Sequence, residues 1–223
     1  MTVCAGFHCS DGVVLCADRQ HTDATYGMKF QRGKVWLSSS QFTGVSFIFT
    51  YSGSPSAAKV MFHKIRDEFG AEFEKEKTGP LERKINRALG RVYASKDSKG
   101  IDTLIGLSLD GSSPCMVRTH GQKVVEASAE LLGVGDSSVL HYLSDLLLAS
   151  PMNVSRGISL GCYLVSCANR YISGCGGGPD IAVLRSGVIQ GGKDKAVAKR
   201  RTMFKQFEKQ VRSAFFKLSV SQK

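Results

Sequence analysis

The sequence lacks any long uncharged apolar stretch, and no segment reaches the ~20 residues that a membrane-spanning helix needs. Its first residues contain no basic segment followed by an apolar one, so we expect no secretory signal. Hydrophobic residues make up 42% of the chain and charged residues 22%, which excludes a disordered or collagen-like protein. We therefore expect a globular protein that is soluble and cytoplasmic.

Signals for a metal, a cofactor or a disulfide framework are also missing. The seven cysteines are odd in number and lie mostly in apolar runs, as buried free thiols do in a reducing compartment. Cys162 and Cys167 do not have the spacing of a zinc site, and the five histidines form no metal-binding motif. The glycines within 174–178 precede no Lys-Ser/Thr pair, which excludes a phosphate-binding loop. We predict no metal and no cofactor.

Positive charge is present but unevenly distributed. The net charge is +11, and residues 193–223 contain ten Lys or Arg against two acids, so most of the excess lies in this segment. We predict a domain over 1–192 and a basic amphipathic helix within 193–223, with apolar residues at 204, 207, 211, 215 and 218. This helix is expected to dock on the body or on a neighbouring subunit. Binding to a membrane surface or to nucleic acid stays an alternative, without a supporting motif.

The order of apolar patterns predicts the fold class. Strand patterns and helix patterns follow one another in blocks, without an internal repeat. We expect strands at 2–9, 13–17, 34–38 and 45–51, helices from 55 and 81, strands at 103–109, 115–119 and 123–127, helices at 137–149 and 154–171, and a strand at 181–184. This order is neither a β-α alternation nor an all-β pattern. It predicts an α+β protein with helices packed outside antiparallel sheets.

The second residue is the most informative one for chemistry. Thr2 follows the initiator Met, and a small side chain at this position normally permits removal of that Met. The α-amine so exposed, with a pKa of ~8, can take the proton of the threonine hydroxyl, which is otherwise a poor nucleophile. Such a site needs a nearby cation and a carboxylate that orients it. Asp18 ends the second predicted strand and Lys34 begins the third, so an antiparallel sheet can place both beside Thr2.

With these residues the sequence resembles a proteasome β-type subunit. The segment TVCAGFHCSDGVVLCAD places Asp18 sixteen residues after Thr2, and Lys34 follows sixteen residues later. The resemblance covers residues 2–187 and implies an N-terminal nucleophile hydrolase with a four-layer αββα sandwich of two antiparallel sheets between helix layers. It implies that Thr2 is the nucleophile, that Lys34 tunes it and that Asp18 is the carboxylate partner of Lys34. It also implies that the N–H group of Gly53 faces the developing oxyanion.

Within this family the sequence is most similar to the bacterial branch called Anbu. Gly-Asp-Ser at 135–137 resembles the Gly-Glu-Ser step of that branch, and Ile-Ser at 172–173 resembles its later Ile-Ser stretch. The resemblance implies that the hydroxyl groups of Ser137 and Ser173 bond to the amine of the nucleophile. For Ser137, a role as a helix N-cap is the alternative.

Other parts of the resemblance concern the substrate. It implies that His21 and Thr22 pair with an extended peptide and that Tyr51 narrows the pocket beside Thr2. One departure is that Asn169 and Arg170 stand where many β-subunits have an aspartate.

The function expected from this resemblance is that of a threonine endopeptidase acting on peptides or unfolded proteins within a homo-oligomeric, ring-like assembly. An ATP-dependent unfoldase is left open as a partner. Two alternatives keep the fold: a non-catalytic structural relative, and an amidase of the same superfamily. A third, from another class, is a binding module that works through the basic tail.

Overall fold

The computed structural model describes residues 2–22, 27–75, 81–94, 100–109, 112–120, 123–133, 138–148 and 151–191, and a few single positions between 199 and 213. The chain divides into two compact units, Met1–Gly192 and Lys193–Lys223. Most of the helix predicted in the second unit lies outside the described residues. Among the helices that are described, none is long and apolar enough to cross a membrane.

The first sheet contains the first and the last described strands of the unit Met1–Gly192. It has five strands in the order β10 (Ala129–Leu132), β1 (Cys4–Cys9), β2 (Gly12–Ala17), β11 (Asp180–Arg185) and β12 (Val188–Gly191), and every pair is antiparallel. Small and apolar residues make up most of β1 and β2, which are buried apart from His8 and are joined by a tight turn. The predicted hairpin over residues 2–17 is confirmed.

The second sheet is a meander. Its order is β5 (Val35–Ser39), β6 (Val45–Ser52), β7 (Asp102–Leu109), β8 (Cys115–His120) and β9 (Lys123–Glu126), again with antiparallel pairs throughout. Between the two sheets in sequence, β3 (Gln20–Thr22) and β4 (Lys29–Gln31) form a separate two-stranded hairpin. The sequence analysis predicted no strand in either segment, because three residues are too few to show an alternating pattern.

In the described part of the unit Met1–Gly192, four helices accompany the sheets: α1 (Pro55–Lys75), α2 (Leu81–Tyr93), α3 (Ser138–Leu147) and α4 (Val154–Tyr171). Helix α1 begins at Pro55, where a fixed φ suits the first turn, and Ser54 Oγ accepts a hydrogen bond from Ala57 N at 3.5 Å. Helix α4 begins after Asn153, whose side chain accepts from Arg156 N. The bounds of α4 are those expected from the sequence.

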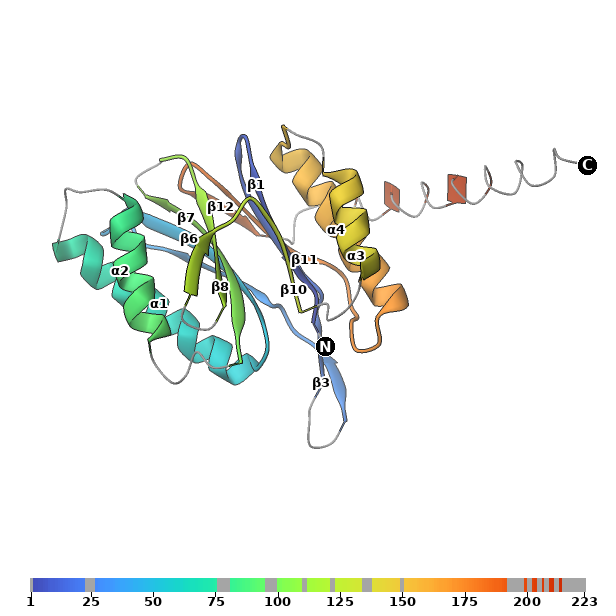
Figure 1. Ribbon diagram of the computed structural model, residues 1–223, viewed down its shortest axis with the longest axis horizontal. Coiled ribbons are helices and arrows are strands. Elements are labelled where there is room, and N and C mark those ends of the chain that lie inside the picture. Colours follow the sequence, from blue (N-terminus) through green and yellow to red (C-terminus); the bar gives the residue numbers. More distant parts are fainter. Residues whose placement is uncertain are drawn as a thin grey trace, which may run out of the picture. The chain divides into compact units, whose positions relative to one another are not determined.

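Two buried clusters hold these elements together. One lies between the sheets, where Val13 and Leu15 of β2 meet Ile48 of β6 and Leu104 of β7. The other, rich in aromatic side chains such as Phe47, fills the space between the second sheet and helices α1 and α2. Helix α4 packs on β1 and β2, and α3 packs on α4 (Figure 1). The α+β class with antiparallel sheets is therefore confirmed.

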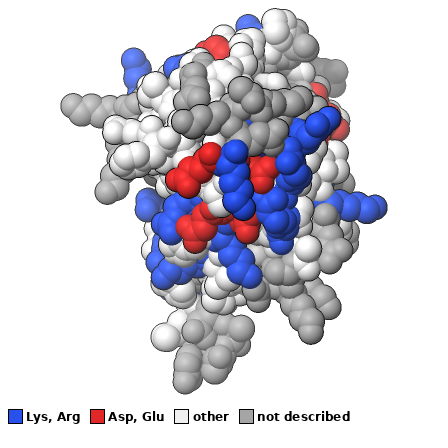
Figure 2. Space-filling view, turned by 90° about the vertical axis from the view of Figure 1, so that its left-hand side faces the viewer, with Lys and Arg blue, Asp and Glu red and all other residues white. Residues whose placement is uncertain are grey.

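Charged side chains cover the outer face of α1 and α2. Figure 2 shows Lys and Arg interleaved with Asp and Glu on this side of the molecule. Arg91 of α2 donates to Glu68 at 2.7 Å and to Glu72 at 2.5 Å, and Arg87 lies 3.4 Å from Glu72. The hydrogen bond from Arg91 lowers the pKa of Glu72. This network ties the two helices together.

Candidate active site

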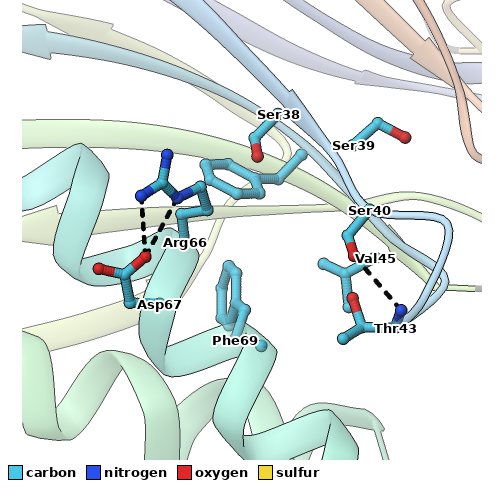
Figure 3. A pocket seen from close by; sticks show the side chains of 10 residues that line it. Ser38, Ser39, Ser40, Thr43, Val45, Arg66, Asp67 and Phe69 are labelled. Atoms are coloured by element: carbon cyan, nitrogen blue, oxygen red, sulfur yellow. Dashed lines mark hydrogen bonds and ion pairs between the residues drawn. The ribbon is translucent and has the colours of Figure 1, made fainter.

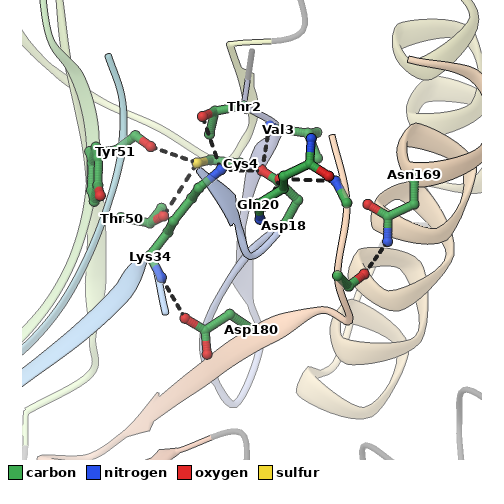
Figure 4. Close-up of polar contacts among 12 residues, drawn as sticks. Thr2, Val3, Cys4, Asp18, Gln20, Lys34, Thr50, Tyr51, Asn169 and Asp180 are labelled. Carbon is green, nitrogen blue, oxygen red and sulfur yellow. Dashed lines mark hydrogen bonds and ion pairs between the residues drawn. The ribbon is translucent and has the colours of Figure 1, made fainter. Parts of the chain in front are cut away.

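Three residues that the sequence singled out lie together at the start of β1. Lys34 Nζ donates to Thr2 Oγ1 at 3.1 Å and to Asp18 Oδ1 at 2.7 Å (Figure 4). Lys34 is 1% exposed and Asp18 is fully buried, whereas Thr2 is partly exposed. The antiparallel register explains the meeting: Cys4 pairs with Ala17, and Asp18 N continues the ladder by donating to Val3 O at 3.0 Å.

The Asp18 carboxylate is the centre of a dense set of hydrogen bonds. Besides Lys34, Oδ1 accepts from Val3 N at 3.0 Å. Oδ2 accepts from Gln20 N at 3.1 Å and from Gly176 N at 3.2 Å. A buried carboxylate is costly unless charge and lone pairs are compensated, and here four donors do so. The bond from Gly176 joins the turn after α4 to the site.

A second aspartate, which sequence reasoning did not assign to the site, fixes the backbone of Lys34. Asp180 Oδ2 accepts from Lys34 N at 2.7 Å and from Val35 N at 2.9 Å. A Cβ at position 33 would lie 2.9 Å from the same oxygen, so only glycine fits there without a shift. Asp180 thus sets where the Lys34 side chain starts. An aspartate directly after a proline and before an apolar strand was the only sequence signal.

The thiol of Cys4 joins β1 to β6 beside the site. Cys4 Sγ donates to Tyr51 O at 2.9 Å and accepts from Thr50 Oγ1 at 3.3 Å. Burial raises the pKa of Cys4 from 9.0 to about 12. The neutral thiol is therefore a structural link, and it is not a nucleophile at neutral pH.

Two glycines let the chain pass close to Thr2. Gly133, which follows β10, has φ +72°, and a Cβ there would collide with Ser52 Oγ and the carbonyl oxygen of Thr2. Gly53 has φ +118°, and a Cβ there would collide with the carbonyl oxygen of Gly100. Because Gly133 touches both Thr2 and Ser52, the Ser52–Gly53 step lies beside the proposed nucleophile. Its role toward an oxyanion stays a prediction.

The predicted contacts of Ser137 and Ser173 with the amine of Thr2 stay predictions. Ser137 falls outside the described residues. Ser173 is exposed, and in the described part of the chain no hydrogen bond joins it to Thr2; the same turn reaches the site through Gly176 instead.

The three predicted substrate residues differ in their surroundings. His21 is 5% exposed and stacks on Phe30 with ring centroids 5.3 Å apart, while Thr22 is exposed. The ring of Tyr51 lies in the aromatic cluster, 5.1 Å from the ring of Trp36, and the carbonyl group of Tyr51 contacts Cys4.

A cavity in another part of the described structure is a weaker candidate for a functional site. It has a volume of about 240 Å³ and lies between the β5–β6 hairpin and α1 (Figure 3). Its one guanidinium, that of Arg66, is paired with Asp67 at 3.0 Å, and none of the predicted site residues lines it. The described residues also contain no group of His, Cys, Asp or Glu that could hold a metal ion.

Comparison with solved structures places this arrangement in a known fold. Anbu (Gly-1) mutant from Hyphomicrobium sp. strain MC1 superposes with a TM-score of 0.75 at 15% identity, covering 96% of this chain and 97% of that one. The chain shares the Anbu fold. Anbu (ancestral beta-subunit) from Yersinia bercovieri gives a TM-score of 0.69 at 11% identity, covering 95% of this chain and 96% of that one.

A third Anbu structure, the helical assembly of the Anbu complex from Pseudomonas aeruginosa, gives a TM-score of 0.67 at 14% identity and covers 95% of this chain and 96% of that one. No protein-family model and no curated protein matches the sequence. The resemblance to Anbu that was predicted from the stretches at 135–137 and 172–173 is confirmed at the level of fold.

Proposed function

We propose that this chain is an N-terminal nucleophile hydrolase, a threonine peptidase of the proteasome β type, whose helices and sheets form the αββα sandwich of that superfamily. The observation that carries the proposal is the position of the Lys34 ammonium, 3.1 Å from Thr2 Oγ1 and 2.7 Å from Asp18. A buried ion pair that ends on a partly exposed hydroxyl at the second residue has no evident use in packing. It suits a hydroxyl that must lose its proton.

In the proposed mechanism, removal of Met1 frees the α-amine of Thr2. The amine takes the hydroxyl proton as Thr2 Oγ attacks the carbonyl carbon of the scissile amide. Lys34 stabilises the negative charge that develops on the attacking oxygen, and the N–H group of Gly53 stabilises the oxyanion. Collapse of the intermediate breaks the C–N bond, and the protonated α-amine gives its proton to the leaving amine. Water, activated by the same amine, then hydrolyses the Thr2 ester.

We also propose that the chain assembles into a homo-oligomer and acts on peptides or unfolded proteins. Support comes from the shared fold and from the helical assembly of the Anbu complex from Pseudomonas aeruginosa. Mass photometry tests this proposal: we expect a species well above a dimer, and a monomer at every concentration would contradict it. An ATP-dependent unfoldase as a partner stays a prediction of the resemblance.

The catalytic proposal is tested by hydrolysis of a panel of fluorogenic peptides by wild-type protein and by Thr2→Ala. We expect turnover by the wild type and loss of at least about a thousandfold in the variant, because a catalytic nucleophile is removed. Thr43→Ala, in the turn between β5 and β6, is the matched control and should keep full activity. Equal turnover by wild type and Thr2→Ala would reject Thr2 as the nucleophile.

A further inference from the structure

A phenylalanine in the turn between β5 and β6 is the most exposed large apolar side chain in the described part of the chain. Phe42 is 99% exposed, whereas the next most exposed, Tyr171, is 69% exposed. Burial of a phenylalanine side chain removes roughly 150–250 Å² from water, which is a large gain that this residue does not make in the single chain. One exposed apolar residue is common on protein surfaces, so a partner for Phe42 needs a second observation.

The second observation is the cavity of about 240 Å³, which lies beside Phe42 at the same hairpin (Figure 3). Ser40 and Val45, on either side of Phe42 in the sequence, line this cavity together with Phe47 and with Phe69 of α1. Val45, Phe47 and Phe69 are buried and give the cavity an apolar floor. Because Phe42 is almost fully exposed, it does not fill this cavity in its own chain.

The size and the lining of the cavity suit one aromatic ring. An apolar cavity of about 150 Å³ can bind benzene, whereas drug-sized ligands occupy pockets of roughly 300–1,000 Å³. A volume of about 240 Å³ is enough for a phenylalanine ring and small for a larger ligand. A ring beside Phe47 and Phe69 would gain the packing energy of aromatic pairs. The hydroxyl groups of the Ser38–Ser40 stretch, which also line the cavity, can stay hydrated around it.

The position of Phe42 next to the cavity makes this surface complementary to itself. A two-fold axis places the same patch of two copies face to face, so that Phe42 of each copy faces the cavity of the other. The hairpin is also accessible, because β5 is the edge strand of its sheet and pairs, among the described strands, with β6 alone. No described strand of the same chain therefore occupies the free side of β5.

The charges that line the cavity fit the same arrangement. Arg66 and Asp67 are both exposed, and the guanidinium donates to the carboxylate at 3.0 and 3.1 Å. A patch with charge of one sign would repel its own copy across a two-fold axis. A patch that contains one charge of each sign does not, because Arg66 of one copy can pair with Asp67 of the other.

We propose that the β5–β6 hairpin is an interface between two copies of this chain, in which Phe42 of each copy inserts into the cavity of the other. Aromatic side chains that fill a pocket of the partner are frequent anchors of protein interfaces. The proposal goes beyond the proposed homo-oligomer, because it names one of its contacts. It does not depend on the chemistry of Thr2.

The test is sedimentation velocity over a dilution series with the full-length wild type and two variants. Phe42→Ser removes the inserted side chain. Gly70→Leu blocks the cavity: Gly70 lies in α1 and lines the cavity, and a Cβ there would meet no atom within 4 Å. We expect each variant to need at least about thirtyfold more protein for the same assembled fraction, the effect of losing one strong interface residue.

Neither substitution should weaken the fold. Phe42→Ser removes a side chain that contacts little in its own chain, and Gly70→Leu replaces a glycine inside a helix, where glycine is unfavourable. Thermal melts should therefore show no loss of stability. The matched controls are Val125→Ser, an exposed apolar residue on the opposite edge strand β9, and Gly90→Leu on α2, where a Cβ also meets no atom within 4 Å. Both should assemble as the wild type does.

A mixture of the two variants tests whether the insertion is exchanged between copies. Phe42→Ser protein keeps an open cavity and Gly70→Leu protein keeps the phenylalanine, so a mixed pair retains one of the two insertions. We expect the mixture to assemble at a lower concentration than either variant alone. A weakening by only one variant or by neither, or a mixture that assembles no better than its components, overturns the proposal.

The same data separate this interface from the proposed larger assembly. If the wild type forms an oligomer that neither variant weakens, the homo-oligomer stands and the hairpin interface falls. If the wild type forms only pairs and both variants dissociate them, the hairpin interface stands and the larger assembly falls. A wild-type monomer at every concentration overturns both.

Discussion

An aspartate flanks the strand β2 at each end, and the two residues have different roles. Asp11 precedes the strand, and its side chain is 46% exposed; it accepts from Val154 N at 2.6 Å and from Arg185 at 2.9 Å. Asp18 follows the strand, is fully buried, and binds three backbone amides and Lys34. Both carboxylates join segments that are distant in sequence, so the bonds to backbone alone do not separate their roles.

The two aspartates differ in the group at which their hydrogen-bond networks end. The partners of Asp11 are the first amide of α4 and a partly exposed arginine, so its network closes on itself and explains why α4 begins where it does. The network of Asp18 passes through Lys34 to a hydroxyl that is partly exposed. Water screens the first carboxylate and not the second. The position of an aspartate at a strand end therefore does not by itself indicate a functional site. Its burial and the group at which its hydrogen-bond network ends are needed as well.

The largest expected effect on stability is that of replacing Asp18, at the buried end of β2. Asp18→Ala leaves the Lys34 ammonium buried without a carboxylate and three backbone amides without their acceptor. We expect a loss of about 3–5 kcal/mol in the free energy of unfolding, as for other broken buried pairs. Urea denaturation followed by circular dichroism measures this loss.

The double variant Asp18→Leu/Lys34→Met is the control for Asp18→Ala, because it removes both charges together. It should regain part of the lost stability yet remain without peptidase activity. A loss below about 1 kcal/mol for Asp18→Ala would place Asp18 in the same class as an exposed carboxylate.

Alkaline pH should lower the free energy of unfolding through Cys4 and Cys9, which lie at the two ends of the neighbouring strand β1, by similar amounts. Burial raises the pKa of Cys4 and that of Cys9 from 9.0 to about 12. In the unfolded chain these thiols ionise near pH 9, whereas in the folded chain they stay protonated, so the free energy of unfolding should fall as the pH rises from about 9 toward 12. Thermal melts between pH 7 and 10.5 measure the slope.

Cys4→Ala and Cys9→Ala should each flatten this alkaline slope by a similar amount. A change confined to Cys4→Ala would mean that the polar network around Lys34, and not burial, controls the thiol.

The smallest effect is expected at the exposed end. Asp11→Ala removes the acceptor for Val154 N and a partly exposed ion pair, which together should cost about 1 kcal/mol of stability. Peptidase activity should be unchanged, because no atom of this network reaches Thr2. Parallel urea titrations and peptide assays of Asp11→Ala and Asp18→Ala check the contrast, and a matching loss of activity in both variants would erase it.

Much of the fold could be predicted because its signals are local. The apolar periodicity of α4, the turn at Asp11 and the cap at Ser54 each lie within a few residues of the element that they define. The strands β3, β4, β10 and β12 were missed. They have only three or four residues each, and they exist because a neighbouring strand offers a ladder and not because their own sequence alternates.

The residues of the candidate site also divide into those that local sequence patterns predict and those that they do not. Thr2, Asp18 and Lys34 could be predicted from spacing because one hairpin and the next strand bring them together. Asp180 could not, because it binds the backbone N–H of Lys34 from 146 residues away. Gly133 could not either, since its closeness to Thr2 follows from the pairing of β10 with β1. Ser173 is exposed, and its predicted contact with the amine of Thr2 stays a prediction.

The central claim is that Thr2 becomes an N-terminal nucleophile, and the most direct measurement is intact-mass analysis before and after treatment with a β-lactone that acylates reactive hydroxyl groups. The account predicts that the purified protein lacks Met1 and gains the mass of one β-lactone. Fragmentation should place the adduct on Thr2, and Lys34→Ala should show little adduct under the same conditions. A protein that retains Met1, or an adduct that forms equally in Thr2→Ala, would contradict it.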